Sequence, residues 1–168
     1  MVIGKKIIKG RRNPYNRLNK IPYDILLNKS ILDLGCNNGG MLYPIADKIS
    51  LGIGYDGDET SIEEARVLTK EQGFENLEFH VMDFEKDELI FPQTDIVFMF
   101  SISNWVKTWK KIIEILKPNI LFFEAHGSRM EKQERFLEEK FETIELLLAE
   151  KEGKAFRKLF LCKNYRNE

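Results

Sequence analysis

The fold of this chain is decided by residues 31–40, which read Ile31-Leu32-Asp33-Leu34-Gly35-Cys36-Asn37-Asn38-Gly39-Gly40. A short apolar run leads into a glycine-rich turn, and an apolar segment of helical period follows the turn. Glycines allow positive φ angles and let the backbone come close to a ligand. The first N–H groups of a following helix lack partners within that helix, so they can bind an anionic group. The stretch therefore predicts a buried strand that ends in a ligand-binding loop.

Strand-length apolar runs alternate with helical patterns over the middle of the chain. We predict strands at residues 31–34, 51–55, 77–82, 95–100 and 120–124. We predict helices at residues 39–49, 61–72, 104–116 and 128–140, with Ser103 or Asn104 capping the third helix and Pro118 ending it. This alternation is typical of a parallel sheet with helices packed on it.

The two ends of the chain depart from that pattern. Residues 141–149 and 155–162 are strand-like runs, and the connection between them is too short for a parallel crossover, so we expect an antiparallel hairpin at a sheet edge. The predicted fold class is therefore α/β, a doubly wound, Rossmann-like, mostly parallel sheet with a C-terminal antiparallel hairpin. Residues 1–30 are too few for a second domain, so we expect an arm that packs on a domain of residues 31–168.

Composition narrows the class of protein. The chain has 168 residues, of which 43% are hydrophobic and 32% charged, and its net charge is −1, as expected for one soluble globular domain without the basic excess of a nucleic-acid binder. Cys36 and Cys162 stand far apart and fit neither a zinc-ligand spacing nor a disulfide framework, so no metal is expected. No apolar run reaches membrane-spanning length. We expect a cytoplasmic protein without a membrane partner, monomeric or weakly oligomeric.

The glycine-rich turn does not have the spacing of dinucleotide enzymes. Their fingerprint is Gly-x-Gly-x-x-Gly, whereas here Asn37 stands where the second glycine belongs and Gly39 follows two residues later. This spacing weighs against a nicotinamide-dependent oxidoreductase.

The same turn resembles the first motif of the class I S-adenosylmethionine-dependent methyltransferases. That motif is an acidic residue followed by Gly-x-Gly-x-Gly, and residues 33–39 match it except for Asn37 in the middle position, where asparagine tolerates a left-handed backbone. The resemblance implies S-adenosylmethionine as the cofactor and a seven-stranded sheet of the methyltransferase type. It implies that the methionine part of the cofactor is held by Asp33, Gly35, Cys36, Asn37 and Gly39.

Two further acids follow at strand ends. Asp56 ends the second predicted strand about 20 residues after the loop, the spacing at which an acid meets the ribose hydroxyls in Rossmann-type sites. By the resemblance, Asp83 contacts the adenine amino group and Phe84 packs beside the base. Gly57, Phe100 and Ser101 complete the predicted cofactor site. Phe100 and Ser101 lie at the exit of the fourth predicted strand, which should line the meeting point of cofactor and acceptor.

A second, shorter resemblance concerns the substrate class. Residues 33–37, Asp-Leu-Gly-Cys-Asn, and residues 101–106, Ser-Ile-Ser-Asn-Trp-Val, are similar to segments of the Bin3-type RNA-phosphate methyltransferases. Trp105 is either part of the core, as its helical spacing indicates, or a substrate contact. Trp109 is assigned to the core.

Glu124 and His126 are the candidate catalytic residues, because both follow the fifth predicted strand and either can take a proton from the acceptor. The alternative is a structural role, with His126 bonded to a loop and Glu124 facing a helix end. Methyl transfer by in-line displacement depends mainly on positioning, so the enzyme does not require a base. His80 is expected to be structural.

The first twenty residues are basic. They contain Lys5, Lys6, Lys9, Arg11, Arg12, Arg17 and Lys20 before the first acid, Asp24. The guanidinium group of arginine can donate two hydrogen bonds at once to phosphate or carboxylate oxygens. Arg11, Arg12 and Arg17 are therefore predicted to contact an anionic methyl acceptor. The alternative is a solvated tail anchored by Tyr15 and Leu18.

The sequence thus predicts an S-adenosylmethionine-dependent methyltransferase with an unidentified acceptor. One alternative is a regulatory module that binds the cofactor without turnover, and another is a nicotinamide-dependent oxidoreductase. Asn37, Asp83 and the terminal hairpin argue against the oxidoreductase.

Overall fold

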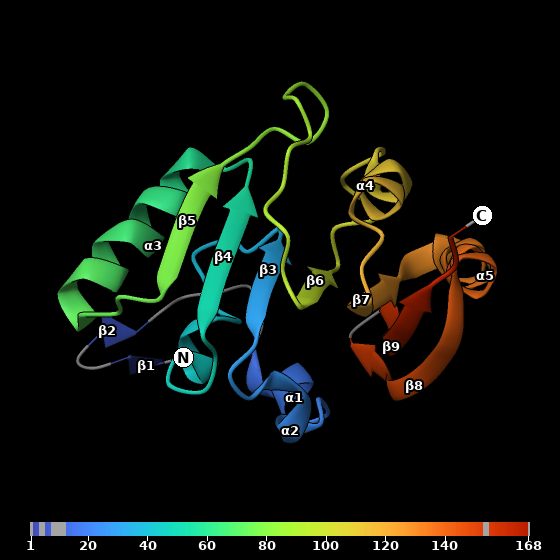
Figure 1. The fold of residues 1–168 in the computed structure, drawn as a ribbon, viewed down its shortest axis with the longest axis horizontal. Helices are drawn as coiled ribbons and strands as arrows, with labels where there is room; N and C mark the ends of the chain where they lie inside the picture. Colours follow the sequence, from blue (N-terminus) through green and yellow to red (C-terminus); the bar gives the residue numbers. More distant parts are fainter. Residues whose placement is uncertain (1, 4–5, 8–12, 153–154, 168) are drawn as a thin grey trace. The chain divides into compact units, whose positions relative to one another are not determined.

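A computed structural model describes residues 2–3, 6–7, 13–152 and 155–167 (Figure 1). The chain divides into two compact units, Met1–Asp83 and Phe84–Glu168. The first unit carries the glycine-rich loop, and the second carries the C-terminal hairpin.

The first unit is built on three parallel strands, β3 (Ser30–Leu34), β4 (Leu51–Asp56) and β5 (Leu77–Val81), in the spatial order β5-β4-β3. Helix α3 (Glu59–Gln72) links β4 to β5 and packs on both. Its N-cap is Asp58, whose carboxylate accepts a hydrogen bond from the N–H of Thr60 at 3.3 Å. Gly73 ends the helix with a left-handed φ of 70°.

The helix predicted at residues 39–49 is wrong. The segment after the loop consists of turns around a short 3₁₀ helix, η1 (Tyr43–Ile45). Pro44 has no N–H to donate to the preceding turn, and Gly39 and Gly40 disfavour helix, so an α-helix cannot run through the segment. Its apolar side chains are nevertheless buried, which explains why the pattern resembled a helix.

The N-terminal part of the same unit holds four short elements. Strands β1 (Val2–Ile3) and β2 (Lys6–Ile7) pair antiparallel, and helices α1 (Tyr15–Leu18) and α2 (Tyr23–Leu26) follow. Ile21 and Leu26 are buried and anchor the two helices.

The second unit contains β6 (Ile96–Phe100), β7 (Ile120–His126), β8 (Phe141–Glu152) and β9 (Ala155–Tyr165), in the spatial order β6-β7-β9-β8. Strands β6 and β7 are parallel, whereas β9 is antiparallel to β7 and to β8, so the predicted hairpin is confirmed. Helix α4 (Trp109–Leu116) precedes β7, and the 3₁₀ helix η2 (Gly127–Arg129) leads into α5 (Met130–Lys140).

Helix α4 begins later than predicted, at Trp109 instead of residue 104, and neither Ser103 nor Asn104 caps it. The cap comes from outside the segment: Glu85 accepts hydrogen bonds from the N–H groups of Lys107 and Thr108, the latter at 3.1 Å. A carboxylate at a helix N-terminus also interacts favourably with the helix dipole. The helix ends before Pro118, as predicted.

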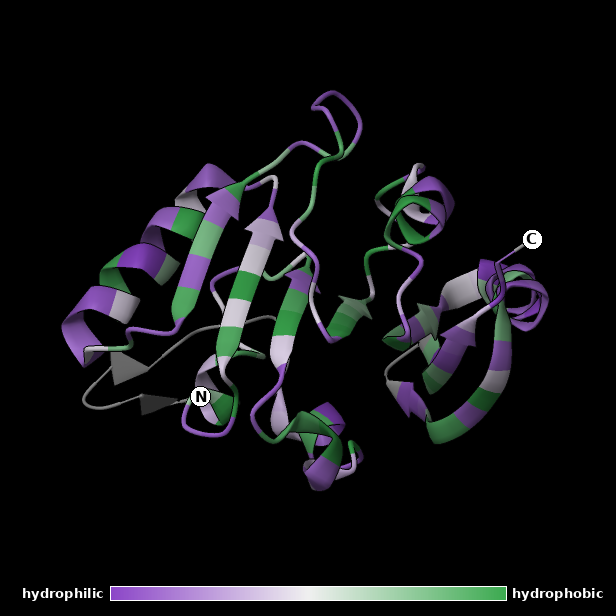
Figure 2. Cartoon of the chain, in the orientation of Figure 1, coloured by the Kyte–Doolittle hydropathy of each residue, from purple (hydrophilic) through white to green (hydrophobic). Residues whose placement is uncertain are grey.

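The strands β3 to β9 give the chain the predicted class: α/β, seven-stranded, mostly parallel, with an antiparallel C-terminal hairpin. Figure 2 shows β3 and β6 as largely hydrophobic, while the outward turns of α3 are hydrophilic, the pattern of strands covered by amphipathic helices. Within the described ranges, no helix is both long and apolar enough to cross a membrane.

Candidate functional site

The loop after β3 adopts the left-handed conformations that its sequence predicts. Gly35, Asn37 and Gly39 have φ angles of 76°, 51° and 81°. The N–H groups of Gly35 and Cys36 both donate to the carbonyl of Tyr55, at 2.8 and 3.1 Å. The loop is therefore tied to the end of the neighbouring strand β4.

Gly39 is required by packing as well as by its backbone angle. A Cβ atom there would lie 2.6 Å from Cζ of Phe79 and 2.7 Å from Cε2 of Tyr43. At Gly40 a Cβ would meet nothing within 4 Å. Of these two adjacent glycines, only Gly39 has a steric reason to be glycine.

Asp56, at the end of β4, lies against the loop. Its Oδ2 accepts a hydrogen bond from the backbone N–H of Asn37 at 2.8 Å, and its Oδ1 accepts one from the N–H of Asp58 at 2.9 Å. The side chain of Asn37 in turn donates to Ser61 Oγ at 3.2 Å. The structure thus brings together the loop and the acid that the sequence assigned to the same cofactor.

Asp33 provides the test of whether a cofactor fits. Its side chain is buried, and its Oδ2 has no hydrogen-bond partner among the residues that the structure describes. Burial raises its pKa to about 7, with Arg17 opposing the shift and the Asp56 carboxylate adding to it. Leaving a buried carboxylate oxygen unsatisfied costs free energy. The ammonium of a bound amino acid would satisfy this oxygen, so the residues fit the methionine end of S-adenosylmethionine.

Cys36 contributes its backbone to the loop. Burial raises the pKa of its thiol well above the usual range, and the carboxylates of Asp33 and Asp56 raise it further. The sulfur also fills the space beside Gly54, where a Cβ would lie 2.7 Å from it. Both effects favour the protonated thiol, which is a poor nucleophile.

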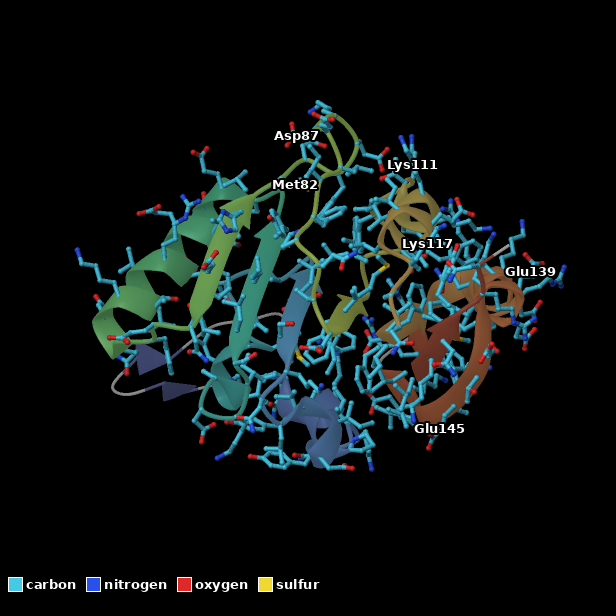
Figure 3. The ribbon with its side chains drawn as sticks, in the orientation of Figure 1. Met82, Asp87, Lys111, Lys117, Glu139 and Glu145 are labelled. Atoms are coloured by element: carbon cyan, nitrogen blue, oxygen red, sulfur yellow. The ribbon has the colours of Figure 1, made fainter. Side chains whose placement is uncertain are left out.

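The third predicted acid, Asp83, lies near Asp56 in the chain's first unit. Met82, labelled in Figure 3, follows β5, and its N–H donates to the carbonyl of Asp56 at 3.0 Å. A Cβ at Gly57 would lie 3.5 Å from the Met82 carbonyl oxygen. Asp33 and Asp56 therefore lie in the last two residues of β3 and β4, and Asp83 comes two residues after β5, so the three acids mark the carboxyl ends of three adjacent parallel strands, where ligands of such sheets bind. Phe84 and Phe100, predicted to join them, are buried in the second unit.

A charged network in the second unit joins three strands. Ser101 follows β6 with a φ of 60°, and its hydroxyl donates to Glu124 on β7 through a short hydrogen bond. Arg157 on β9 donates from Nη1 to Ser101 Oγ at 2.8 Å and to Glu124 Oε1 at 3.1 Å. The side chains of Glu124 and Arg157 are 2% and 16% exposed, so this is a largely buried ion pair.

The sequence did not predict Arg157 as a residue of this network. Arg157 faces His126 in the register of β7 and β9, a pairing that brings it beside Glu124. The hairpin itself was predictable, but no sequence spacing reveals which residue of β9 lies opposite β7.

His126, at the end of β7, is buried and held by its backbone. Its N–H donates to Gln133 Oε1 at 3.2 Å, and its carbonyl accepts a hydrogen bond from Asn104 at 3.0 Å. Gln133 also donates to Ser103 at 2.9 Å. Because side chains two residues apart share a face of a strand, the imidazole lies on the same face of β7 as Glu124.

The two tryptophans differ in exposure. Trp105 is 75% exposed, which excludes the core interpretation of this residue and leaves the predicted substrate contact untested, whereas Trp109 is 7% exposed and packs against Phe123 and Phe136 as predicted. The reason is the late start of α4, which leaves residue 105 in the preceding turn. The aromatic side chain of Trp105 is therefore exposed to solvent.

Of the three predicted acceptor contacts, Arg11 and Arg12 lie outside the described residues. Arg17, on α1, is half-buried and donates from Nη1 to Met41 Sδ at 3.6 Å. His80, expected to be structural, is on β5, with its ring stacked on Tyr55 at 5.2 Å between centroids.

The strand order and the loop at the end of the first parallel strand define a class I methyltransferase fold. Residues 26–160 match the model of a methyltransferase domain family, so the chain belongs to that family. The N-terminal domain of EvdMO1, crystallised in the presence of SAH and D-fucose, is similar in structure, with a TM-score of 0.78 over 96% of this chain and 87% of that chain, at 15% identity. A SAM-dependent methyltransferase from Aquifex aeolicus matches with a TM-score of 0.62 over 89% of each chain, at 17% identity.

A relative in sequence is the U6 snRNA methylphosphate capping enzyme Amus of Drosophila melanogaster, 30% identical over 98 residues. The match covers 49% of this chain and 33% of the relative, so the chain spans only part of that protein's length. The resemblance to class I and Bin3-type methyltransferases is confirmed, and S-adenosylmethionine is the cofactor of this domain.

Proposed function

We propose that this chain transfers the methyl group of S-adenosylmethionine to an oxygen atom of an anionic, phosphate-bearing acceptor. When bound, the cofactor supplies a methyl group on a sulfonium, which a nucleophile displaces in line. The observation that carries the proposal is the buried, unsatisfied carboxylate of Asp33 beside a loop fixed by Asp56, in a chain of the methyltransferase domain family. Asp56 is assigned to the ribose hydroxyls, and Asp83 with Phe84 to the adenine.

A phosphate acceptor is supported by the relatives and by the basic segment. The matched relative is named for methylphosphate capping. Residues 101–106 also resemble a segment of the phosphate-methylating family. Arg11 and Arg12 are assigned to the acceptor, because guanidinium groups bind phosphate oxygens in a bidentate manner. Trp105, 75% exposed, offers an aromatic face on which a planar part of the acceptor can stack.

The state of Glu124 also favours an acceptor that is already anionic. Its Oε1 already accepts hydrogen bonds from Ser101 and Arg157, which leaves this oxygen less available to take a proton from an acceptor. A phosphate oxygen carries negative charge at neutral pH, so no proton has to be removed before methyl transfer. Glu124 then acts as a positioning residue for Ser101, and His126, the other candidate base, is not essential.

The test uses a cell extract divided in two, with one half treated with phosphatase that is then removed. Each half is incubated with the protein and methyl-labelled S-adenosylmethionine, and Gly35→Val serves as the variant that cannot bind the cofactor. Label should enter the untreated half alone, and His126→Gln should retain most of the activity. Equal labelling of both halves would exclude a phosphate oxygen as the acceptor. Cofactor binding without labelling of either half would favour a regulatory module.

The proposal places this chemistry in the cytoplasm. Cys36 and Cys162 are free and buried, the state of thiols in a reducing compartment. Fractionation of cells that produce a tagged protein tests this location.

A further inference from the structure

Residues 101–106, which follow β6, have a fixed backbone although the side chain of Trp105 is exposed. The N–H groups of Trp105 and Val106 both donate to the carbonyl of Ile102, at 2.8 and 3.0 Å. The position of the Trp105 ring therefore depends on what attaches this loop to the rest of the second unit.

Three residues from three elements form a closed cycle of hydrogen bonds at this loop. Gln133, on α5, donates from Nε2 to Oδ1 of Asn104 at 3.2 Å. Asn104 donates from Nδ2 to the carbonyl of His126, at the end of β7, at 3.0 Å. The N–H of His126 donates to Oε1 of Gln133 at 3.2 Å, which closes the cycle. The Nε2 group of Gln133 also donates to Ser103 Oγ at 2.9 Å.

The direction of the cycle is set by the backbone of His126. A backbone N–H can only donate, so the amide oxygen of Gln133 must face it, and the NH₂ group of Gln133 is left for the loop. A backbone carbonyl can only accept, so the NH₂ group of Asn104 must face it, and the oxygen of Asn104 is left for Gln133. Both positions therefore require a side chain that has a donor and an acceptor.

The cycle is buried and closely packed. Gln133 is 1% exposed and Ser103 is 3% exposed. A Cβ atom at Gly127, whose φ is 75°, would lie 2.9 Å from Nδ2 of Asn104, so glycine leaves the room that Asn104 needs. Burying a polar side chain costs free energy unless its hydrogen bonds are made. An apolar side chain could fill the position of Gln133, but it could not fix the loop through directional contacts.

We propose that Gln133 is a positioning residue for the methyl acceptor. Through Asn104 it attaches residues 101–106 to the end of β7, and it thereby holds Trp105 where the acceptor stacks on the indole ring. Gln133 is buried and does not touch the acceptor itself. The inference rests on the proposed function, in which Trp105 contacts the acceptor.

The experiment uses two substitutions of Gln133 and a control on the same helix. Gln133→Met keeps the length of the side chain and removes its hydrogen bonds, whereas Gln133→Glu keeps an acceptor for the His126 N–H and loses the donor to Asn104. Glu139→Met changes an exposed residue of α5, labelled in Figure 3. Each substitution is made alone and together with Trp105→Ala, and circular dichroism confirms that each variant is folded.

The rate of methyl transfer from labelled S-adenosylmethionine is measured at increasing concentrations of untreated cell extract, the source of the acceptor. Gln133→Met should raise the extract concentration that gives the half-maximal rate about tenfold, within the range for the loss of one aromatic stacking contact. The maximal rate and the affinity for S-adenosylhomocysteine should not change. Gln133→Glu should cause a smaller increase, and Glu139→Met none. In the Trp105→Ala background, Gln133→Met should add nothing, because the contact that Gln133 positions is already lost.

Fluorescence tests the attachment of the loop without an acceptor. The chain has two tryptophans, so Trp109→Phe leaves Trp105 as the fluorescent indole. The fluorescence anisotropy of Trp105 should fall when Gln133→Met is added to Trp109→Phe, because the loop gains freedom of motion.

Three results would overturn the proposal. Additive effects of Gln133→Met and Trp105→Ala would show that Gln133 does not act through Trp105. Parallel losses of acceptor methylation and of affinity for S-adenosylhomocysteine would show a general structural role. Unchanged anisotropy in Gln133→Met would show that Gln133 does not fix the loop. If the wild type binds S-adenosylhomocysteine but labels no extract, the proposed function fails, and the anisotropy still decides whether Gln133 fixes the loop.

Discussion

The backbone N–H of Asn37 donates a hydrogen bond to the carboxylate of Asp56 across 2.8 Å, although the two residues are 19 positions apart. The acid at the end of β4 therefore fixes the loop after β3 in addition to its assigned contact with the ribose. One side chain links the two halves of the cofactor site, so its loss affects both.

Replacing Asp56 should weaken the binding of S-adenosylhomocysteine by an amount that depends on what the new side chain retains. Asp56→Asn keeps an oxygen that can accept the Asn37 N–H but loses the charge, whereas Asp56→Ala loses both. We expect the affinity for S-adenosylhomocysteine to fall about tenfold or more in Asp56→Ala, and less in Asp56→Asn, as measured by calorimetry. Glu71→Ala, an exposed acid near the end of α3, serves as the control. Equal affinities of Asp56→Ala and wild type would remove Asp56 from the site.

Cofactor binding should depend on pH through Asp33. Its pKa of about 7 means that the carboxylate is largely protonated below neutral pH, and a protonated carboxyl does not pair with an ammonium. The affinity for S-adenosylhomocysteine should rise as the pH increases from 6 to about 7 and then level off, with proton release near neutral pH. Calorimetry in buffers of different ionisation enthalpy measures this release. A pH-independent affinity in the wild type over this range would contradict the assignment.

The raised pKa of Asp33 should also make the stability of the ligand-free protein depend on pH. The folded state raises the pKa of Asp33 from 3.8, so it binds more protons than the unfolded chain between pH 4 and 7. The stability contributed by protonated Asp33 is therefore lost as the pH rises through the folded-state pKa. Asp33→Asn, which stays neutral, should show a smaller loss of the free energy of unfolding between pH 5 and 8, measured by urea denaturation.

The adjacent glycines Gly39 and Gly40 make a matched pair. In Gly39→Ala the new methyl group would lie 2.6 Å from Phe79 at a φ of 81°, so we expect a loss of about 1–3 kcal/mol in the free energy of unfolding. In Gly40→Ala nothing lies within 4 Å, and stability should stay within about 0.5 kcal/mol of wild type. Urea denaturation measures both. Similar losses in the two variants would contradict the crowding at Gly39.

The pair of Arg157 and Glu124 should matter more for stability than a neighbouring, more exposed pair. Arg157→Met leaves the Glu124 carboxylate buried without its cation, which costs about 3–5 kcal/mol. Lys158→Met breaks the ion pair between Lys158 and Glu134, whose side chains are 28% and 24% exposed. This loss should cost about 1 kcal/mol or less. Equal costs in a urea titration would contradict the burial of the first pair. Adding Glu124→Gln to Arg157→Met should recover part of the loss.

The two tryptophans should separate function from stability. Trp109→Ala creates a cavity against Phe123 and Phe136 and should cost about 3–5 kcal/mol in the free energy of unfolding. Trp105→Ala removes a side chain that is 75% exposed and should change stability by about 0.5 kcal/mol or less while lowering methylation of the acceptor. Full activity of folded Trp105→Ala would remove Trp105 from the acceptor site.

The sequence by itself determined the fold class, because the periods of apolar residues and the turn residues between them are local properties. Residues 31–40 predicted the loop, and Asp56 and Asp83 could be named as candidates because acids at the carboxyl ends of parallel strands meet at one sheet edge. One failure was local, because Pro44 prevented a helix that the apolar pattern had predicted. The other was not, because Glu85, distant in sequence, set the true start of α4.

Tertiary structure alone decided which groups act as pairs. Strand register placed Arg157 beside Glu124, although the two residues are 33 positions apart in the chain. Tertiary structure also raised the pKa of Asp33 to about 7 through burial. Desolvation depends on all the atoms that surround a group, and no spacing along the sequence encodes that environment.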